Sequence, residues 1–150
     1  MKVKDIMTKK VITVKPELGI HKLAQVFVKK NISGAPVVDG KGKLKGLVLE
    51  EGLVYRDKKV HLPTFIAILT GFIALGGAKY EQEMKKITAK TVSGIMDKNP
   101  VVIFPDTGVE QVATMIIDDG IRYFLVMDND KLAGVVTKKD IVRAIAKGKI

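Results

Sequence analysis

Apolar and polar positions in the first third of the chain predict a strand, a helix, two further strands and a closing helix. Residues 11–14 form an apolar, β-branched run of the kind that favours strands. Apolar residues then recur at i, i+3, i+4 and i+7 across 20–27, which is typical of one buried helix face. Pro16 and Glu17 favour the start of that helix just upstream, because proline and an acid both suit a first helical turn. The other elements follow at residues 35–38, 44–48 and 53–54.

The same pattern returns about 89 residues later, and the residues themselves repeat with it. Shifting the chain on itself by 89 positions, and by 88 after Gly42, aligns about 15 identical residues over about 51 positions. The second copy starts its helix at Pro105 and Asp106, and its apolar segments are residues 101–104, 109–116, 124–127, 132–136 and 141–145.

This repetition predicts an α/β (α+β) fold of two pseudo-symmetric β-α-β-β-α repeats. We assign them to residues 1–56 and 92–150, with residues 57–91 as a hydrophobic helical connector. About 50 residues bury too little apolar surface to be safely stable alone. We therefore expect the two repeats to pack through their sheets, with clefts between them.

The overall composition excludes several kinds of chemistry. The 150 residues include no Cys and two His, so thiolate zinc sites, iron–sulfur clusters, Cys nucleophiles and His-rich metal centres are not expected. Lys and Arg outnumber Asp and Glu by 26 to 16, and the net charge of +10 favours a nucleotide, a nucleic acid or an anionic lipid as partner. The first residues contain no apolar signal-peptide core, so we expect a cytoplasmic protein.

The connector contains an uncharged stretch at residues 62–78. Its 17 residues fall short of the roughly 20 that a membrane-spanning helix needs. Because it is apolar on nearly all sides, we interpret it as a buried helix that packs between the subunits of a homodimer, and not as a membrane span.

Several short motifs resemble those of the cystathionine-β-synthase (CBS) domain. They are Ile6-Met7-Thr8, VITVKPE at 11–17, ISGAPVVD at 32–39, Gly46-Leu47-Val48, and Gly134-Val135-Val136-Thr137-Lys138-Lys139-Asp140. The last run resembles the family's Gly-apolar-apolar-Ser/Thr-x-x-Asp signature. Two such domains in tandem resemble a Bateman module, which implies a regulatory, non-catalytic sensor. The implied ligand is AMP, ADP, ATP or S-adenosylmethionine, and the signal would pass to an unknown downstream protein.

The resemblance also implies a ligand site shared between the repeats. Asp140 would accept hydrogen bonds from the vicinal hydroxyls of a ribose, and Thr137 would contact a phosphate or ribose oxygen. The spacing of this pair fits a helix cap almost as well, with Thr137 as N-cap and Asp140 three residues later. The residues of the implied site are Thr8, Lys10, Val11, Ile12, Ser33, Gly34, Ala35, Pro36, Val135, Thr137, Lys138 and Asp140.

The mirror-related cleft lacks the two signature residues. Leu49 stands at the position of Thr137, and Gly52 stands at the position of Asp140. An arginine there could still hold a phosphate. We therefore expect a weaker or empty second site, lined by Ile121, Arg122 and Tyr123.

Two other functions are weighed against a ligand sensor. The charge of +10 would also suit a nucleic-acid-binding regulatory protein, although aromatic residues make up 5% of the chain and no helix-turn-helix or stacking motif is recognisable. An enzyme is not expected, because no nucleophile and base are paired in the pattern. The acidic pairs Glu50-Glu51 and Asp118-Asp119 are interpreted as solvated helix ends.

Overall fold

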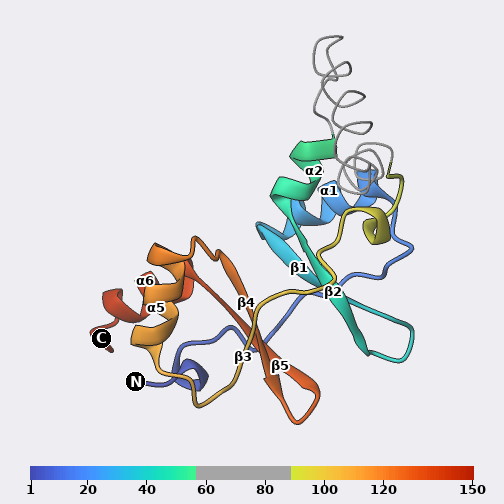
Figure 1. The fold of residues 1–150 in the computed structure, drawn as a ribbon. Helices are drawn as coiled ribbons and strands as arrows, with labels where there is room; N and C mark the ends of the chain where they lie inside the picture. Colours follow the sequence, from blue (N-terminus) through green and yellow to red (C-terminus); the bar gives the residue numbers. More distant parts are fainter. Residues whose placement is uncertain (57–88) are drawn as a thin grey trace, which may run out of the picture.

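The computed structural model describes residues 1–56 and 89–150. The predicted α+β fold of two repeats is confirmed, and each repeat combines a small sheet with two α-helices (Figure 1). The predicted connector helix lies outside the described residues. The elements, in chain order, are η1 (Val3–Asp5), α1 (Ile20–Lys30), β1 (Gly34–Val38), β2 (Leu44–Leu49), α2 (Glu50–Arg56), η2 (Val92–Gly94), β3 (Val102–Ile103), α5 (Val109–Asp118), β4 (Tyr123–Asp128), β5 (Lys131–Thr137) and α6 (Lys138–Ala146).

Both sheets are built around one antiparallel hairpin. β1 pairs with β2, and β4 pairs with β5, each with a bulge near the turn. The short strand β3 adds to the second sheet in parallel with β4. The strand predicted at 11–14 is reduced to one bridge, in which Val14 pairs in parallel with Val37 of β1.

Both long helices begin later than the sequence predicts. Gly19 and Gly108 are the N-cap residues, so α1 and α5 start three to four residues beyond the two Pro-acid pairs. The backbone around Pro16 has another partner, because its carbonyl oxygen accepts a hydrogen bond from the amide of Ser93, 2.9 Å away. Asp106 is likewise held by Lys side chains from the start of the chain. Tertiary contacts therefore override the local start signal.

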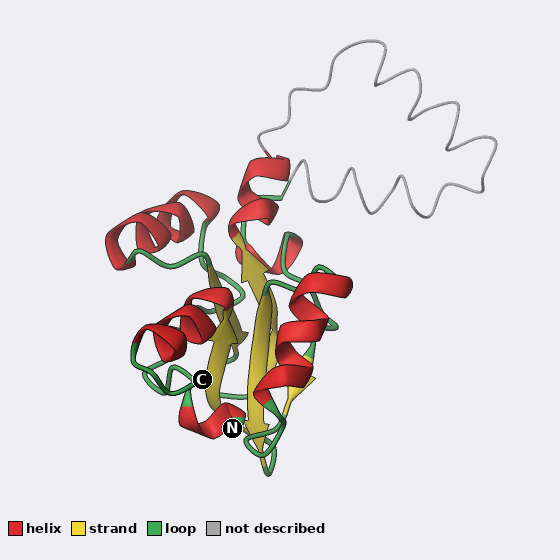
Figure 2. Cartoon of the chain, turned by 90° about the vertical axis from the view of Figure 1, so that its left-hand side faces the viewer, coloured by secondary structure: helices red, strands yellow, loops and turns green. Residues whose placement is uncertain are grey.

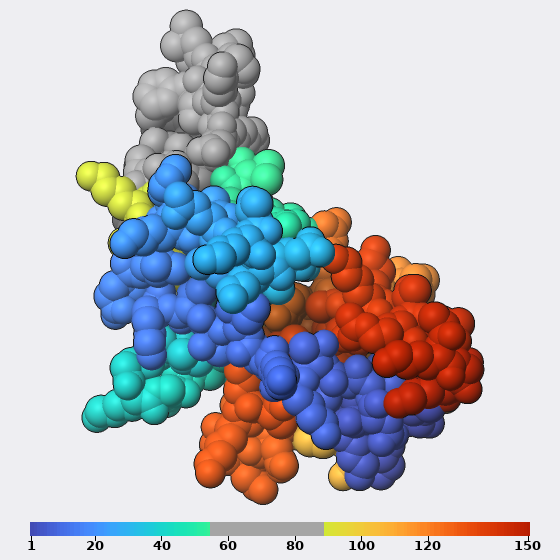
Figure 3. Space-filling model, turned by 180° about the vertical axis from the view of Figure 1, so that it is seen from behind, coloured from blue at the N-terminus to red at the C-terminus, as the bar shows by residue number. Residues whose placement is uncertain are grey.

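The two repeats exchange their first segments. Val3 and Ile6, from the start of the chain, lie in the core of the second repeat beside α5 and β4. Val92 and Ile95, which precede the second repeat, lie in the core of the first beside α1 and β1. Figure 3 shows the dark blue N-terminal segment against the red C-terminal part. The sequence repeats are therefore not the packing units.

Backbone hydrogen bonds fix this exchange in the same way on both sides. Thr8 and Val135 exchange two bonds, Thr8 N–H to Val135 oxygen at 2.9 Å and Val135 N–H to Thr8 oxygen at 3.0 Å. At the equivalent positions, Asp97 and Leu47 exchange two bonds of 2.7 and 2.9 Å. Each first segment thus pairs with the outer hairpin strand of the other repeat.

The alternation of side chains along the strands separates two kinds of core. One face of each sheet packs on its own helices, which lie on the outside of the strands in Figure 2. The opposite faces meet each other, and Leu47 of β2 packs there with Tyr123 and Leu125 of β4 and Val135 of β5. The predicted packing of the repeats through their sheets is therefore present, and it places a pocket at the edge of this contact.

Candidate functional site

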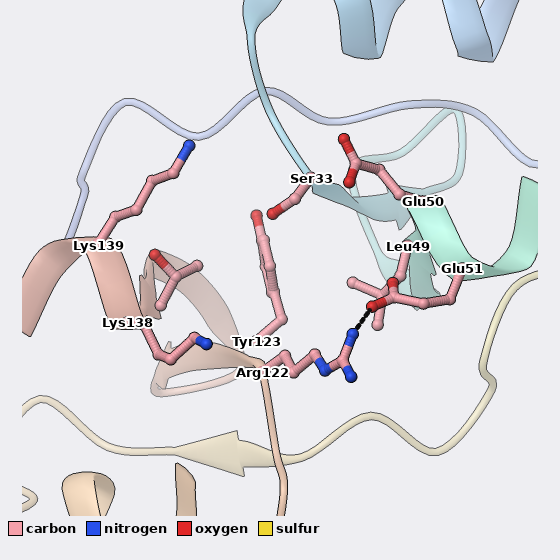
Figure 4. Close-up of a pocket in the computed structure, with 9 residues that line it drawn as sticks. Ser33, Leu49, Glu50, Glu51, Arg122, Tyr123, Lys138 and Lys139 are labelled. Atoms are coloured by element: carbon pink, nitrogen blue, oxygen red, sulfur yellow. Dashed lines mark hydrogen bonds and ion pairs between the residues drawn. The ribbon is translucent and has the colours of Figure 1, made fainter.

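A pocket of about 220 Å³ lies between the two repeats. Figure 4 shows its charged side chains arranged around Tyr123. Its lining residues come from the ends of β2 and β5, the starts of α2 and α6, and the residues that precede or begin β1 and β4: Ser33, Leu49, Glu50, Glu51, Arg122, Tyr123, Thr137, Lys138 and Lys139.

Equivalent positions of the repeats face each other across this pocket, but their charges are opposite. Glu50 and Glu51 of the first repeat correspond to Lys138 and Lys139 of the second. Arg122 pairs with Glu51 across the repeats (Figure 4). The pocket thus has an acidic side and a basic side, and the ion pair joins them. The acidic pair alone predicts only a solvated helix end, but its alignment with two lysines was a usable signal for the pocket.

Asp140 is held behind the pocket by four hydrogen bonds. Its side chain is 4% exposed and accepts bonds from the Thr137 amide (2.8 Å) and the Thr137 hydroxyl (2.9 Å). Arg143 donates a bond of 2.8 Å, and Thr8 Oγ1 donates one of 2.7 Å. The cap predicted for Thr137 and Asp140 is therefore present. Thr8 adds a contact from the exchanged segment, so this carboxylate links both repeats.

The equivalent position in the first repeat has no such link. Gly52 replaces Asp140, and the Ile95 backbone oxygen lies 3.4 Å from where a Cβ would stand. Asp97 replaces Thr8 and accepts a hydrogen bond from the amide of Asn99, 2.9 Å away. The Thr8–Asp140 pair is thus replaced by a pair that cannot form a hydrogen bond between side chains.

Gly34 lies against the side chains of Leu49 and Tyr123. A Cβ at Gly34 would lie 2.6 Å from Leu49 Cδ2 and 3.0 Å from the Tyr123 ring. Tyr123 is 8% exposed, and this burial, together with the charge of Asp140, raises the pKa of its phenol. Its hydroxyl therefore stays protonated at neutral pH and can serve as a hydrogen-bond donor.

The structure brings only part of the predicted site to the pocket. Ser33, Thr137 and Lys138 line it, together with Arg122 and Tyr123 of the second predicted set. Lys10 is exposed and Ile12 half-buried, whereas Ala35 and Pro36 are buried in β1. Val11 and Val135 pack in the contact between the sheets, and Ile121 packs on the core of the second repeat.

The described residues contain neither a metal-binding cluster nor a membrane-spanning helix. Across 1–56 and 89–150, no group of three or more His, Asp or Glu is placed to hold a metal ion. Among the helices in the same ranges, none is long and apolar enough to cross a membrane.

Two pseudo-equivalent repeats around a charged pocket define a paired-domain binding module. The sequence profile of the CBS domain matches residues 3–58 and 92–147. The chain therefore belongs to the CBS domain family and contains two CBS domains in tandem.

Several relatives span most of this chain. An uncharacterized protein of Methanocaldococcus jannaschii is 29% identical over 97% of this chain and 91% of its own length. The chloroplastic CBS domain-containing protein CBSX1 of Arabidopsis thaliana is 29% identical over 93% of this chain and 62% of its own. An L-aspartate semialdehyde sulfurtransferase of M. jannaschii is 28% identical over 94% of this chain, but that match covers 22% of the enzyme.

Two similar solved structures contain adenosine compounds. CBSX2 in complex with AMP has a TM-score of 0.79 at 27% identity, over 99% of both chains. The CBS domain pair of protein MJ0100, in complex with 5′-methylthioadenosine and S-adenosylmethionine, has a TM-score of 0.69 at 26% identity, over 99% of this chain and 98% of that one.

Proposed function

We propose that this chain is a non-catalytic regulatory module that binds an adenosine-containing ligand between its two CBS repeats. The observation that carries the proposal is the cluster of Arg122, Lys138 and Lys139 at one pocket whose two sides belong to different repeats. A ligand that contacts both sides favours one relative arrangement of the repeats, and a partner protein can respond to that arrangement. The adenosine compounds bound by CBSX2 and by MJ0100 support this ligand class.

The basic side of the pocket suits the anionic part of such a ligand. Lys138 and Lys139 are the first two residues of α6, where free backbone N–H groups and the helix dipole also favour a phosphate. Arg122 can bind a phosphate with two parallel hydrogen bonds, provided that it leaves Glu51. Anion binding therefore competes directly with the ion pair that joins the repeats.

We place the ribose at Asp140, where the ribose hydroxyls would replace the Thr8 hydroxyl as hydrogen-bond donors to the carboxylate. The pocket of about 220 Å³ is smaller than the roughly 300 Å³ at which drug-sized ligand sites begin. A whole nucleotide must therefore extend beyond it, and separation of Thr8 from Asp140 would open the cleft in that direction. Each hydrogen bond from a ribose hydroxyl to the Asp140 carboxylate is worth about 1.5–3 kcal/mol, which offsets the loss of the hydrogen bond from Thr8.

Calorimetric titration with AMP, 2′-deoxy-AMP, 5′-methylthioadenosine and S-adenosylmethionine tests this assignment. We expect 2′-deoxy-AMP to bind about tenfold or more weakly than AMP, because one hydrogen bond to Asp140 is missing. The Lys138→Gln/Lys139→Gln variant should lose affinity for AMP and keep it for 5′-methylthioadenosine, which has no phosphate. Lys131→Gln, at an exposed lysine of the β4–β5 hairpin, is the matched control. If none of the four compounds binds, the proposed function is wrong.

A further inference from the structure

The positive charge of the chain is concentrated in its first repeat. Residues 1–56 contain twelve Lys and Arg against five Asp and Glu, whereas residues 92–150 contain eight of each. Four of these lysines lie in or beside the turn of the β1–β2 hairpin, and all four are exposed: Lys15, Lys41, Lys43 and Lys45. We call them the hairpin lysines. Figure 3 shows the turquoise hairpin protruding from the body of the molecule.

Asp39 holds the hairpin lysines together in one place. Its carboxylate accepts hydrogen bonds from the backbone amides of Lys41 and Lys43, both at 2.9 Å, and these bonds shape the turn. The ammonium group of Lys45 lies 3.8 Å from the same carboxylate. Lys15 reaches the turn from outside the hairpin, and its ammonium group donates to the Asp39 backbone oxygen at 2.6 Å. Four positive charges therefore surround one carboxylate, and an external anion would relieve their repulsion.

The second repeat has the same hairpin without this cluster of charge. Each hairpin is an antiparallel pair of strands with a bulge near the turn. Only Lys43 aligns with another lysine, Lys131. The residues equivalent to the other three hairpin lysines are Phe104, Asp130 and Ala133. The fold therefore does not require these three charges, which indicates that they serve a contact made by the surface of the first repeat.

The hairpin is narrow, and its turn stands in open space. The sheet of the first repeat contains only the strands β1 and β2 among the described residues. A Cβ added at Gly40 or Gly42 would meet no atom within 4 Å. Two-stranded ribbons of this kind fit the major groove of B-DNA, which is about 12 Å wide and has phosphates along both edges. The major groove of duplex RNA is deep and narrow and does not accommodate such a ribbon.

The composition of the hairpin favours contacts with phosphates over contacts with bases. Residues 39–46 contain no Arg, Asn or Gln, whose forked side chains bind a base edge with two hydrogen bonds, whereas lysine acts as a point charge. They also contain no aromatic residue on which the bases of a single strand could stack. None of the large exposed apolar residues lies within 39–46, so the turn offers nothing to insert into a membrane.

We propose that the hairpin lysines bind the phosphate backbone of double-stranded DNA without preference for its sequence. This surface is separate from the ligand pocket, because β2 runs about 13 Å from Lys45 near the turn to Leu49 at the pocket. DNA binding at the hairpin therefore does not depend on the proposed adenosine ligand. Each neutralised phosphate contributes about −0.9 to the slope of log affinity against log salt concentration, so four lysines predict a slope of about −3.6.

Fluorescence anisotropy with a short labelled DNA duplex tests this proposal. For the wild type, we expect the dissociation constant to rise about a hundredfold between about 50 and 200 mM salt. The Lys41→Gln/Lys43→Gln/Lys45→Gln variant should bind more weakly, with a slope of about −1. The matched control, Lys22→Gln/Lys29→Gln/Lys30→Gln, removes the same charge from exposed lysines of α1 and should keep a slope near that of the wild type. Circular dichroism of each variant checks that it is folded.

Four results would overturn the proposal. If the wild type does not bind the duplex at about 50 mM salt, or if both triple variants weaken binding equally, the hairpin is not a DNA site. Tighter binding to a single strand of the same length, or a clear preference between duplexes of unrelated sequence, would contradict recognition of the duplex backbone. Sedimentation with phosphatidylserine vesicles is the remaining comparison. Vesicle binding that the hairpin variant loses, without duplex binding by the wild type, would assign this surface to a membrane instead.

Discussion

The hydrogen bond between Thr8 and Asp140 should stabilise the packing of the first segment on the second repeat. In the Thr8→Val variant the side chain keeps its shape and loses only the hydroxyl that donates 2.7 Å to Asp140. A hydrogen bond to a charged acceptor is worth about 1.5–3 kcal/mol, and the lower half applies here because the carboxylate keeps three other donors. We therefore expect the free energy of unfolding to fall by about 1.5–2 kcal/mol. For a chain of this length, that lowers the melting temperature by about 3–6 °C.

Urea titration and hydrogen exchange together measure this effect. The midpoint of the urea titration should fall while the slope stays the same, since the wild type and Thr8→Val expose the same surface on unfolding. Amide exchange should accelerate first at Val3 and Lys4, whose amides donate to Thr107 and Pro105. Thr13→Val, at an exposed threonine of the same segment, is the matched control. If the two variants lose equal stability, the reasoning that the Thr8 hydroxyl anchors the segment is refuted.

Three further predictions concern other contacts between the repeats. Two lysines of the first segment hydrogen-bond Asp106 and lower its pKa from 3.8 to about 2, so the stability from this contact is present above pH 4 and is lost as the pH falls through 2. Amide exchange of the first segment measured across that range checks this, and an unchanged profile in Asp106→Asn would contradict it. Gly46→Ala should lower the free energy of unfolding by about 1–3 kcal/mol, because its Cβ would lie 2.5 Å from a backbone oxygen of the second exchanged segment. Gly40→Ala, with open space around it, should change little in the same urea titration. Glu51→Gln frees the guanidinium that it pairs with and should tighten pyrophosphate binding about two- to fivefold by calorimetry. Glu50→Gln removes the same charge from the pocket without breaking the ion pair. An equal gain in pyrophosphate affinity in that variant would argue against competition between pyrophosphate and Glu51 for the arginine.

Local sequence patterns predicted the elements of the fold but not the way in which they are exchanged. The apolar stripes identified both long helices, and the strand runs identified both hairpins, because these signals depend on neighbours a few residues apart. The helix starts were wrong because the carbonyl of Pro16 binds the amide of Ser93, which lies far away in the chain. No local pattern shows that Val3 lies in the core of the second repeat or that Val92 lies in the core of the first.

Sequence spacing likewise predicted one part of the candidate site and missed another. The cap of Thr137 and Asp140 follows from a spacing of three residues, and the structure contains it. The third partner of Asp140 is Thr8, 132 positions earlier, and it became visible only once the first segment was placed. Arg122 was predicted as a phosphate ligand of a second cleft, but its pairing with Glu51 places it at the pocket that Thr137 lines. Spacing along the sequence cannot predict which residues make contact across the two repeats.

The exchanged segment also suggests how a ligand between the repeats would be sensed. Thr8 pairs with Val135 in the second repeat, and six residues later Val14 pairs with Val37 in the first. This stretch is therefore a short covalent route from one sheet to the other. In the proposed complex a ribose takes the place of the Thr8 hydroxyl at Asp140, so the ligand acts at one end of that route. A shift of Thr8 would then reach β1 through the six residues that lead to Val14. The contact that holds Thr8 on Asp140 would thus become the element that responds when the ligand binds.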